Sequence, residues 1–297
     1  MVPALFFLFA SLINDVRGLI ARHDFAGAER TVRGYQAQTG ATSELAAALS
    51  WLARGALDAR RLDQAESYSA ETRKLALELL RTRQLDSDRW LPTALGASIE
   101  VHAQSLAARG ERPEAIAFLR QQLDLFGASS LDERIRKNIN LLTLEGKPAP
   151  LLQENDWLGP KPASLAALRG HPVLLFFWAH WCPDCKAEAP VLASLRNAYG
   201  PKGLILIGPT RLYGYVAGGN EAAPTTEKQY IDQVRRRYYA ALADMPVPLS
   251  AANFLSYGAS TTPTLILIDA AGVVRFYHPG AASEPELSAR IQAILRE

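Results

Sequence analysis

The chain has 297 residues, which is enough for two domains of ordinary size. Hydrophobic residues make up 48% and charged residues 21%, so the composition excludes a disordered, collagen-like or multi-span membrane protein. The 32 basic and 30 acidic side chains give a net charge of +2, and the basic residues are scattered, which argues against nucleic-acid binding. Two cysteines, Cys182 and Cys185, are too few for a disulfide-stapled scaffold, and no nearby Cys or His spacing completes a metal site.

The N-terminal segment 1–13, MVPALFFLFASLI, is apolar but too short to span a bilayer as a helix. Its length suits the core of a signal peptide, whereas a basic start and a good cleavage site are missing. We expect either a signal or anchor remnant or a first helix buried in the domain behind it.

Residues 14–145 show the three-and-four apolar spacing of helices. Three stretches in this region share one pattern, an apolar helix end, a polar turn and an Ala that opens the next helix: LIARHDFAGA (19–28), ALDARRLDQA (56–65) and LAARGERPEA (106–115). These stretches resemble tetratricopeptide helical hairpins, although their intervals are irregular and most of the large aromatic positions of that repeat are absent. The sequence therefore predicts a degenerate tetratricopeptide-like domain, with a generic helical bundle as the alternative. Such a domain would offer a surface for a protein partner or for self-association.

Residues 146–163 contain four prolines and predict a linker, in which Leu151 and Leu152 could form a short edge strand. Residues 164–297 then alternate strands and helices. The runs PVLLFFWA (172–179), GLILI (203–207) and LILID (265–269) are apolar except for the final Asp269, as in strands of a sheet covered on both faces. VVRFYH (273–278) follows an Ala-Gly turn and should pair antiparallel with the strand before it, and helices are expected over 187–199 and 284–296. This is a small α/β domain with a mixed sheet.

The sequence Trp181-Cys182-Pro183-Asp184-Cys185 stands where the first buried strand ends and a helix begins. Two residues between cysteines on a first helical turn allow a small disulfide ring, and the free amides of the helix start favour a thiolate at Cys182. Cys182 is thus the expected nucleophile and Cys185 the resolving thiol, with Pro183 suited to a helix start and Trp181 shielding the site. The alternatives are a structural disulfide and half of a metal site completed by another chain.

A second motif, Thr261-Thr262-Pro263-Thr264, directly precedes the strand LILID, where a proline is confined to the strand start or to a tight turn. The peptide bond here could be cis, which would present the backbone of Thr262 to an extended peptide beside the sulfurs.

Together, GKPAP (146–150), SLAALRGHPVLLFFWAHWCPDCKAEAPVL (164–192) and YGASTTPTLILIDAAG (257–272) resemble the thioredoxin superfamily, and within it the TlpA/ResA-like thiol:disulfide oxidoreductases. The resemblance covers about half of the chain. It implies a thioredoxin fold, reduction of protein disulfides and an extracytoplasmic location, periplasmic or membrane-associated through an anchor or signal sequence, with a cytoplasmic location as the alternative. We expect protein disulfides or dithiols as substrates, a redox partner protein and no bound cofactor. The resemblance makes Cys182 and Cys185 the redox pair, Pro263 the cis-proline and Glu188 the acid after the second cysteine.

Glu188 also has a physical rationale, because it lies one helical turn beyond Cys185 and could take the proton that the resolving thiol loses. Its alternative is an ordinary solvated helix charge. His180 departs from the family pattern; if protonated, it would favour the thiolate at Cys182.

An insert, residues 208–246, separates the strand 203–207 from the Thr262-Pro263 motif. It contains Arg211, Tyr213 and Tyr215, and a helix is expected from Glu227 to Ala243. These residues could form a lid or peptide-reading loop near the cysteines. The alternative is a solvated helix with loop aromatics packed on the domain.

The sequence therefore predicts a thiol:disulfide oxidoreductase with an N-terminal helical interaction module. One rival is a peroxiredoxin-like peroxidase, but the Pro-x-x-x-Thr-x-x-Cys context of a peroxidatic cysteine is absent from LFFWAHWC. A second rival is a helical scaffold with a vestigial redox domain, yet both cysteines, the tryptophan and the Thr-Pro pair are intact.

Overall fold

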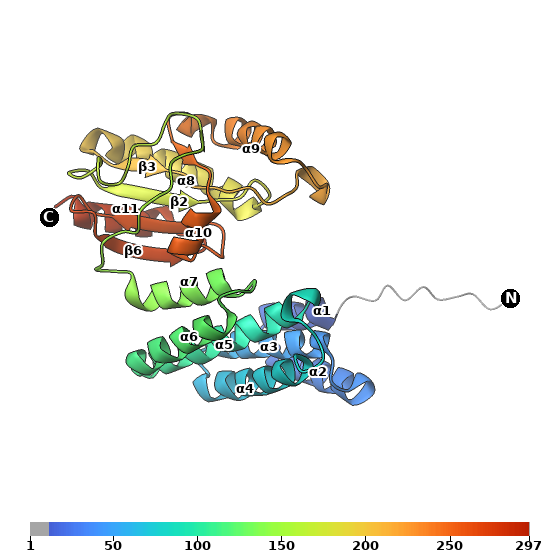
Figure 1. Ribbon diagram of the computed structural model, residues 1–297. Helices are drawn as coiled ribbons and strands as arrows, with labels where there is room; N and C mark the ends of the chain where they lie inside the picture. The colour runs from blue at the N-terminus through green and yellow to red at the C-terminus, as the bar shows by residue number, and fades with distance from the viewer. Residues whose placement is uncertain (1–11, 297) are drawn as a thin grey trace. The chain divides into compact units, whose positions relative to one another are not determined.

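The computed structural model describes residues 12–296, which divide into two compact units, one ending at Ile135 and the other starting at Arg136 (Figure 1). The division falls within α7 (Asp132–Thr143), before the boundary expected at residue 145. The second half of α7 packs closely on the C-terminal unit: a Cβ added at Gly258, whose φ is +61°, would lie 2.5 Å from the backbone nitrogen of Lys137. The amino-acid composition changes after α7, whereas the boundary between the two compact units falls inside α7. The sequence does not show this, because helical spacing does not reveal which hydrophobic core a helix packs against.

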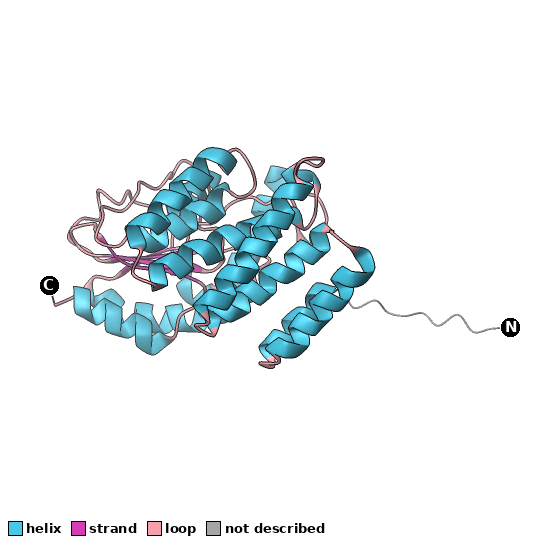
Figure 2. Ribbon diagram, turned by 90° about the horizontal axis from the view of Figure 1, so that it is seen from below, coloured by secondary structure: helices cyan, strands magenta, loops and turns pink. Residues whose placement is uncertain are grey.

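All regular structure between residues 12 and 143 is helical (Figure 2). The helices before α7 are α1 (Leu12–Ala21), α2 (Phe25–Thr39), α3 (Ser43–Asp58), α4 (Leu62–Leu79), α5 (Leu91–Ala108) and α6 (Arg112–Phe126), with a short 3-10 helix, η1 (Leu85–Ser87), between α4 and α5. The predicted all-helical N-terminal region is confirmed; its assignment to the tetratricopeptide class stays a prediction.

The predicted apolar segment 1–13 lies outside the described residues except for Leu12 and Ile13. Both belong to α1 and are buried in the helical unit. In the part of the chain that the structure describes, no helix combines the length and apolar character needed to cross a membrane.

The three similar stretches of the helical unit form the same turn. Their fifth residues, His23, Arg60 and Gly110, have left-handed φ values of +62°, +60° and +89°. In each turn the next amide bonds a carbonyl five residues earlier at 2.9 Å, as in Asp24 N to Leu19 O, which is how a helix commonly ends at a left-handed residue. The Ala that opens the following helix is fully buried in all three, which lets α1, α3 and α5 pack closely on α2, α4 and α6. The shared pattern is therefore a repeated helical hairpin.

The C-terminal unit has a thioredoxin-like fold around a four-stranded sheet of order β3-β2-β5-β6. The strands are β2 (Val173–Phe177), β3 (Ile205–Ile207), β5 (Thr264–Ile268) and β6 (Val274–Pro279). β3 runs parallel to β2, whereas β5 runs antiparallel to both β2 and β6, so the predicted mixed sheet and its terminal hairpin are confirmed.

Helices cover both faces of this sheet, as the apolar strands predict. Leu174 and Phe176 of β2 belong to one core, which includes residues of α8 (Pro183–Tyr199) and α11 (Glu284–Ile294). The alternate residues of β2 belong to a second core, which includes residues of α10 (Ala251–Tyr257). Successive strand side chains point to opposite faces, so a strand that is buried throughout requires cover on both sides.

The edge strand predicted at Leu151 and Leu152 is wrong; it lies instead at β1 (Trp157–Leu158), which pairs antiparallel with β4 (Val247–Pro248). The backbone after Leu152 is held by a side chain, because Asn253 accepts from the Gln153 amide at 2.7 Å and donates to the Gln153 carbonyl at 3.0 Å. Leu152 is buried in the second core. Leu152 thus anchors a loop here, while Leu151 is exposed, and the Asn253 side-chain amide takes the place of a strand partner.

The insert 208–246 leaves and re-enters the domain at neighbouring points. The amide of Gly208 donates to the Pro246 carbonyl at 2.9 Å, and the amide of Thr210 donates to the Pro248 carbonyl at 3.0 Å. Its helix α9 (Pro224–Tyr238) begins earlier and ends earlier than expected, and two 3-10 helices, η3 (Ala217–Gly219) and η4 (Ala240–Leu242), flank it. A third, η2 (Gly200–Lys202), follows α8.

The repeated turns allow a matched test. Replacing Arg60 by Gly removes the penalty of a left-handed non-glycine residue and should raise the free energy of unfolding by about 0.5 to 1 kcal/mol. Gly110→Ala should lower it by a similar amount. Urea unfolding followed by far-UV circular dichroism measures both changes, and equal stabilities for all three proteins would contradict the account of the turns.

Candidate active site

The two cysteines form a disulfide at the start of α8, with their Cα atoms 5.3 Å apart. Cys182 occupies the N-cap position, and its sulfur accepts the backbone N–H of Cys185 at 3.0 Å. A helix start leaves several amides without carbonyl partners, so a sulfur placed there meets hydrogen-bond donors and a partial positive charge. This environment favours the thiolate form of Cys182 when the disulfide is reduced.

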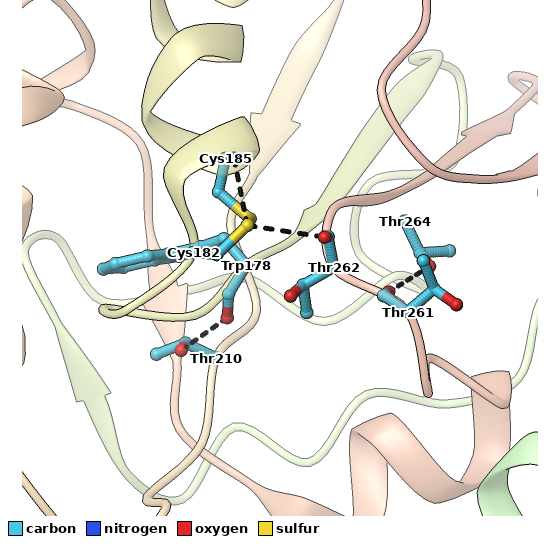
Figure 3. The surroundings of a disulfide bond; sticks show 7 residues. All are labelled: Trp178, Cys182, Cys185, Thr210, Thr261, Thr262 and Thr264. Carbon is cyan, nitrogen blue, oxygen red and sulfur yellow. Dashed lines mark hydrogen bonds between the residues drawn. A yellow bond between two sulfur atoms is a disulfide. The ribbon is translucent and has the colours of Figure 1, made fainter. Parts of the chain in front are cut away.

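Thr262, the residue before Pro263, lies directly beside this disulfide (Figure 3). The peptide bond between Thr262 and Pro263 is cis, as the resemblance implied. The carbonyl oxygen of Thr262 is 3.4 Å from Cys182 Sγ, although the two residues are far apart in the sequence. Pro263 is buried and Thr262 is half-buried, so the backbone that precedes the proline borders the sulfur.

The segment between β2 and the cysteines is tied to the start of the insert. Trp178 is fully buried, and its Nε1 donates to the Gly208 carbonyl at 2.9 Å. The hydroxyl of Thr210 donates to the Trp178 carbonyl at 2.8 Å (Figure 3). These bonds fix the path of the chain that leads from the central strand to Cys182.

Glu188 lies in α8 and is only 5% exposed. The solvated alternative for this residue is therefore wrong, because α8 turns this face into the core that contains Cys185. Burial raises the pKa of the Glu188 carboxyl. Two neighbours partly offset that rise: the backbone N–H of Ala282, which donates to Glu188 Oε1 at 3.4 Å, and the nearby His278. A carboxyl with a raised pKa, one turn after Cys185, has the character of a proton acceptor.

His180 is buried, which changes the expectation for its charge. Its Nε2 lies 3.4 Å from Glu227 Oε1, and the rings of Tyr213, Tyr215 and Tyr230 stand edge-on around it at 5.4 to 5.6 Å. Burial lowers the pKa of His180, Glu227 acts against that shift, and Lys186 adds to it. The imidazole is therefore neutral at neutral pH, so the condition under which His180 would favour the Cys182 thiolate is not met at that pH.

The remaining predicted residues border the disulfide to different degrees. Trp181 is 46% exposed and Pro183, the first residue of α8, is also exposed, whereas Cys182 itself is only 2% exposed. Trp181 packs edge-on against Tyr213 of the insert at 5.6 Å. The structure thus gathers the residues expected at the site from three separate parts of the chain. Within residues 12–296, no group of three or more His, Cys, Asp or Glu side chains is placed to hold a metal ion.

Comparisons with known proteins agree with this geometry. The family model described as Redoxin matches residues 144–293. The chain belongs to the redoxin family. It is 32% identical over 156 residues to the thiol:disulfide interchange protein DsbE of Pseudomonas fluorescens biotype C, a match that covers 51% of this chain and 78% of that one.

Two further proteins are similar to about half of the chain. The thioredoxin-like protein YneN of Bacillus subtilis is 28% identical, with 50% of this chain and 78% of that protein covered. A crystal structure of a thiol:disulfide interchange protein of the thioredoxin family from Chlorobium tepidum aligns with 24% identity and a TM-score of 0.36, covering 50% of this chain and 96% of the other. The C-terminal half of this redoxin is a thioredoxin-like oxidoreductase domain.

Some residues of the redoxin site have no clear signal in the sequence. Glu227 reads as an ordinary acid in the first turn of a helix, and Tyr230 as an ordinary aromatic residue. Trp178 reads as the end of an apolar strand. Their roles depend on which segments the fold brings beside Cys182, and no local pattern records that.

The buried His180 predicts a pH dependence of stability. Because its pKa is lowered on folding, its contribution is fully present above the unfolded pKa of about 6.5 and is lost as the pH falls through the folded value. His180→Gln should reduce the loss of unfolding free energy on acidification, by at most about 1.4 kcal/mol per pH unit. The measurement is urea unfolding at a series of pH values from about 7.5 to about 5.

The exposed His171 supplies the matched control for this prediction. His171→Gln should keep the pH dependence of the wild type. A His180→Gln protein with an unaltered pH dependence would show that His180 does not titrate as described.

Proposed function

We propose that this redoxin is a thiol:disulfide oxidoreductase that exchanges disulfides with proteins through Cys182 and Cys185. The observation that carries the proposal is the disulfide at the start of α8, with Cys182 Sγ both capping the helix and lying against the Thr262 carbonyl. A disulfide that closes so short a loop stabilises a fold very little, so its placement points to chemistry. The name of the DsbE relative, a thiol:disulfide interchange protein, supports the same reaction.

The reaction proceeds in two exchange steps. In the reduced protein, the Cys182 thiolate attacks one sulfur of a substrate disulfide, which forms a mixed disulfide and releases the other substrate sulfur as a thiolate. The Cys185 thiol then loses its proton and attacks Cys182 Sγ, which forms the Cys182–Cys185 disulfide and releases the second substrate thiolate. The substrate gains two electrons and the protein loses two, and a dithiol redox partner restores the protein by the reverse steps.

The substrate would bind as an extended segment along Thr262 and Pro263. The backbone at this position borders Cys182 Sγ, so a peptide that adds beside it brings its own sulfur close to the nucleophile. Trp181 and Pro183, both exposed, adjoin Cys182 in the sequence and would also meet the substrate. No bound cofactor is needed, because both electrons are carried by the two sulfurs.

Glu188 would accept the proton that Cys185 loses in the second step. Its burial beside the core that holds Cys185 and its raised pKa support this role. A carboxyl whose pKa is raised is a better proton acceptor than a solvated one, whose conjugate acid is too strong.

We further propose that the helical unit binds a protein partner and that the protein works outside the cytoplasm. The three equivalent hairpins support the first proposal, because stacked helical hairpins form extended surfaces for protein partners. The second is supported by the resemblance to the extracytoplasmic TlpA/ResA-like oxidoreductases. We also keep as a proposal the domain limits expected from the sequence, which are a helical domain over residues 14–145, a linker over 146–163 and a thioredoxin-like domain over 164–297.

Replacing each cysteine should separate the two steps. Cys182→Ser should reduce the turnover of insulin, with dithiothreitol as the electron donor, to the background rate, because the attacking thiolate is gone. Cys185→Ser should instead form a mixed disulfide on Cys182 that persists on a non-reducing gel. Turnover by Cys182→Ser at the wild-type rate would overturn the proposed function.

Glu188→Gln should slow the second step while leaving the fold stable. We expect the release of substrate from the mixed disulfide to slow by roughly 10²-fold, because the proton acceptor is lost, and its pH dependence to flatten. Stopped-flow measurement of this step over a pH series tests both effects.

The stability of the same variant provides a check on its cause. A carboxyl whose pKa is raised on folding loses its stabilising contribution as the pH rises, so Glu188→Gln should be at least as stable as the wild type at neutral pH. A slower rate accompanied by a destabilised fold would indicate a structural role instead of proton transfer.

A further inference from the structure

One carboxylate in the insert holds a loop beside the redox motif. Glu227 lies in the first turn of α9, and its side chain is only 1% exposed. Its Oε1 accepts the backbone N–H of Tyr213 at 2.6 Å, and its Oε2 accepts that of Gly214 at 2.8 Å. Gly214 has a φ of +86°, a conformation that suits glycine and lets two successive amides converge on one side chain.

The partners of Glu227 explain why this buried charge is kept. A buried carboxylate is tolerated when hydrogen bonds replace its water shell, and here two backbone amides do so. The third neighbour, His180, is neutral because burial lowers its pKa, so Glu227 is not simply one half of an ion pair. Its strongest bonds go to the loop, and the loop is therefore what it fixes.

The loop fixed in this way reaches the two residues that precede Cys182. The ring of Tyr213 stands edge-on to Trp181 and to His180, both at 5.6 Å, and Tyr215 stands edge-on to His180 at 5.4 Å. Edge-to-face pairs at these distances are favourable and directional. The position of the loop thus sets the surroundings of Trp181.

The same loop also contacts the helix that leads to the Thr262–Pro263 motif. Tyr213 is edge-on to Phe254 of α10 at 6.4 Å, and the guanidinium of Arg211 lies 4.7 Å from the centre of the Phe254 ring. Residues 211–215 therefore contact both the cysteine side and the α10 side of the site. We call these five residues the insert loop.

Exposure shows what an approaching molecule meets first. Trp181 is 46% exposed whereas Cys182 is 2% exposed, so a large substrate must rest on Trp181 and its surroundings before its disulfide reaches the sulfur. A small disulfide needs no such support. A residue that orients Trp181 and the insert loop should therefore affect the rate of exchange with protein disulfides more than the rate with small disulfides.

From this geometry we infer that Glu227 is a positioning residue that holds the insert loop and Trp181 as a rigid support for protein substrates of the disulfide exchange. The inference rests on the proposed function and deepens it, because it assigns the insert to recognition of protein disulfides. Glu227 touches neither sulfur in this role. It acts through the amides of Tyr213 and Gly214.

The test compares a protein disulfide with a small one. Glu227→Gln, which loses one of the two acceptors, should lower kcat/KM for insulin roughly ten-fold, mainly through KM, because the support is misplaced. The rate of the reduced protein with bis(2-hydroxyethyl) disulfide should stay within about two-fold of the wild type. Glu221→Gln removes an exposed carboxylate from the same insert and should match the wild type on both substrates.

A second variant decides the matter if Glu227→Gln does not fold, as judged by its thermal melt. Tyr213→Leu leaves the two backbone amides and Glu227 in place but removes the ring on Trp181, and it should give the same contrast between the two substrates. Equal losses on insulin and on the small disulfide, or no loss on insulin, would overturn the inference. A wild-type protein that reduces neither substrate would instead overturn the proposed function.

Discussion

The first turn of α8 needs hydrogen-bond acceptors for its backbone amides, and the sulfur of Cys182 is one of them. This single requirement links the fold to the chemistry. The buried strand β2 ends shortly before α8 begins. The start of this helix favours negative charge on the sulfur of Cys182, which caps it. Cys185 follows one turn later and is close enough to form a disulfide with Cys182. A strand that ended elsewhere would leave the two cysteines without the electrostatic environment on which the proposed exchange reaction depends.

The rest of the site is arranged around that junction by segments that are distant in the sequence. Pairing of β5 with β2 brings the cis Thr262–Pro263 bond beside Cys182 Sγ. Hydrogen bonds from Thr210 and to Gly208 tie the insert to Trp178 on the opposite side. The site is thus a meeting of three chain segments, and only one of them carries the sulfurs.

Two buried carboxylates serve this site in different ways. Glu188 has its pKa raised by burial, with a single long hydrogen bond from a backbone amide, and so is suited to proton transfer. Glu227 has two short hydrogen bonds from successive backbone amides and so is suited to holding a loop. Both side chains are buried, so the difference between them lies in the number of amide donors. One long hydrogen bond leaves Glu188 suited to accept a proton, whereas two short ones make Glu227 suited to hold the loop.

The sequence by itself determined the four strands of the main sheet, the helix start and the closeness of the two cysteines, because these follow from local patterns. An apolar run such as 172–179 must be buried on both faces, and cysteines two residues apart on a first helical turn must lie close together. Local pattern also marked the three helical turns, where the backbone conformation repeats at His23, Arg60 and Gly110. Only the tertiary structure decided the charge of His180, the burial of Glu188 and the hydrogen bonds that Glu227 accepts from the insert loop. Those properties depend on desolvation and on partners contributed by remote segments, which no local pattern of residues encodes.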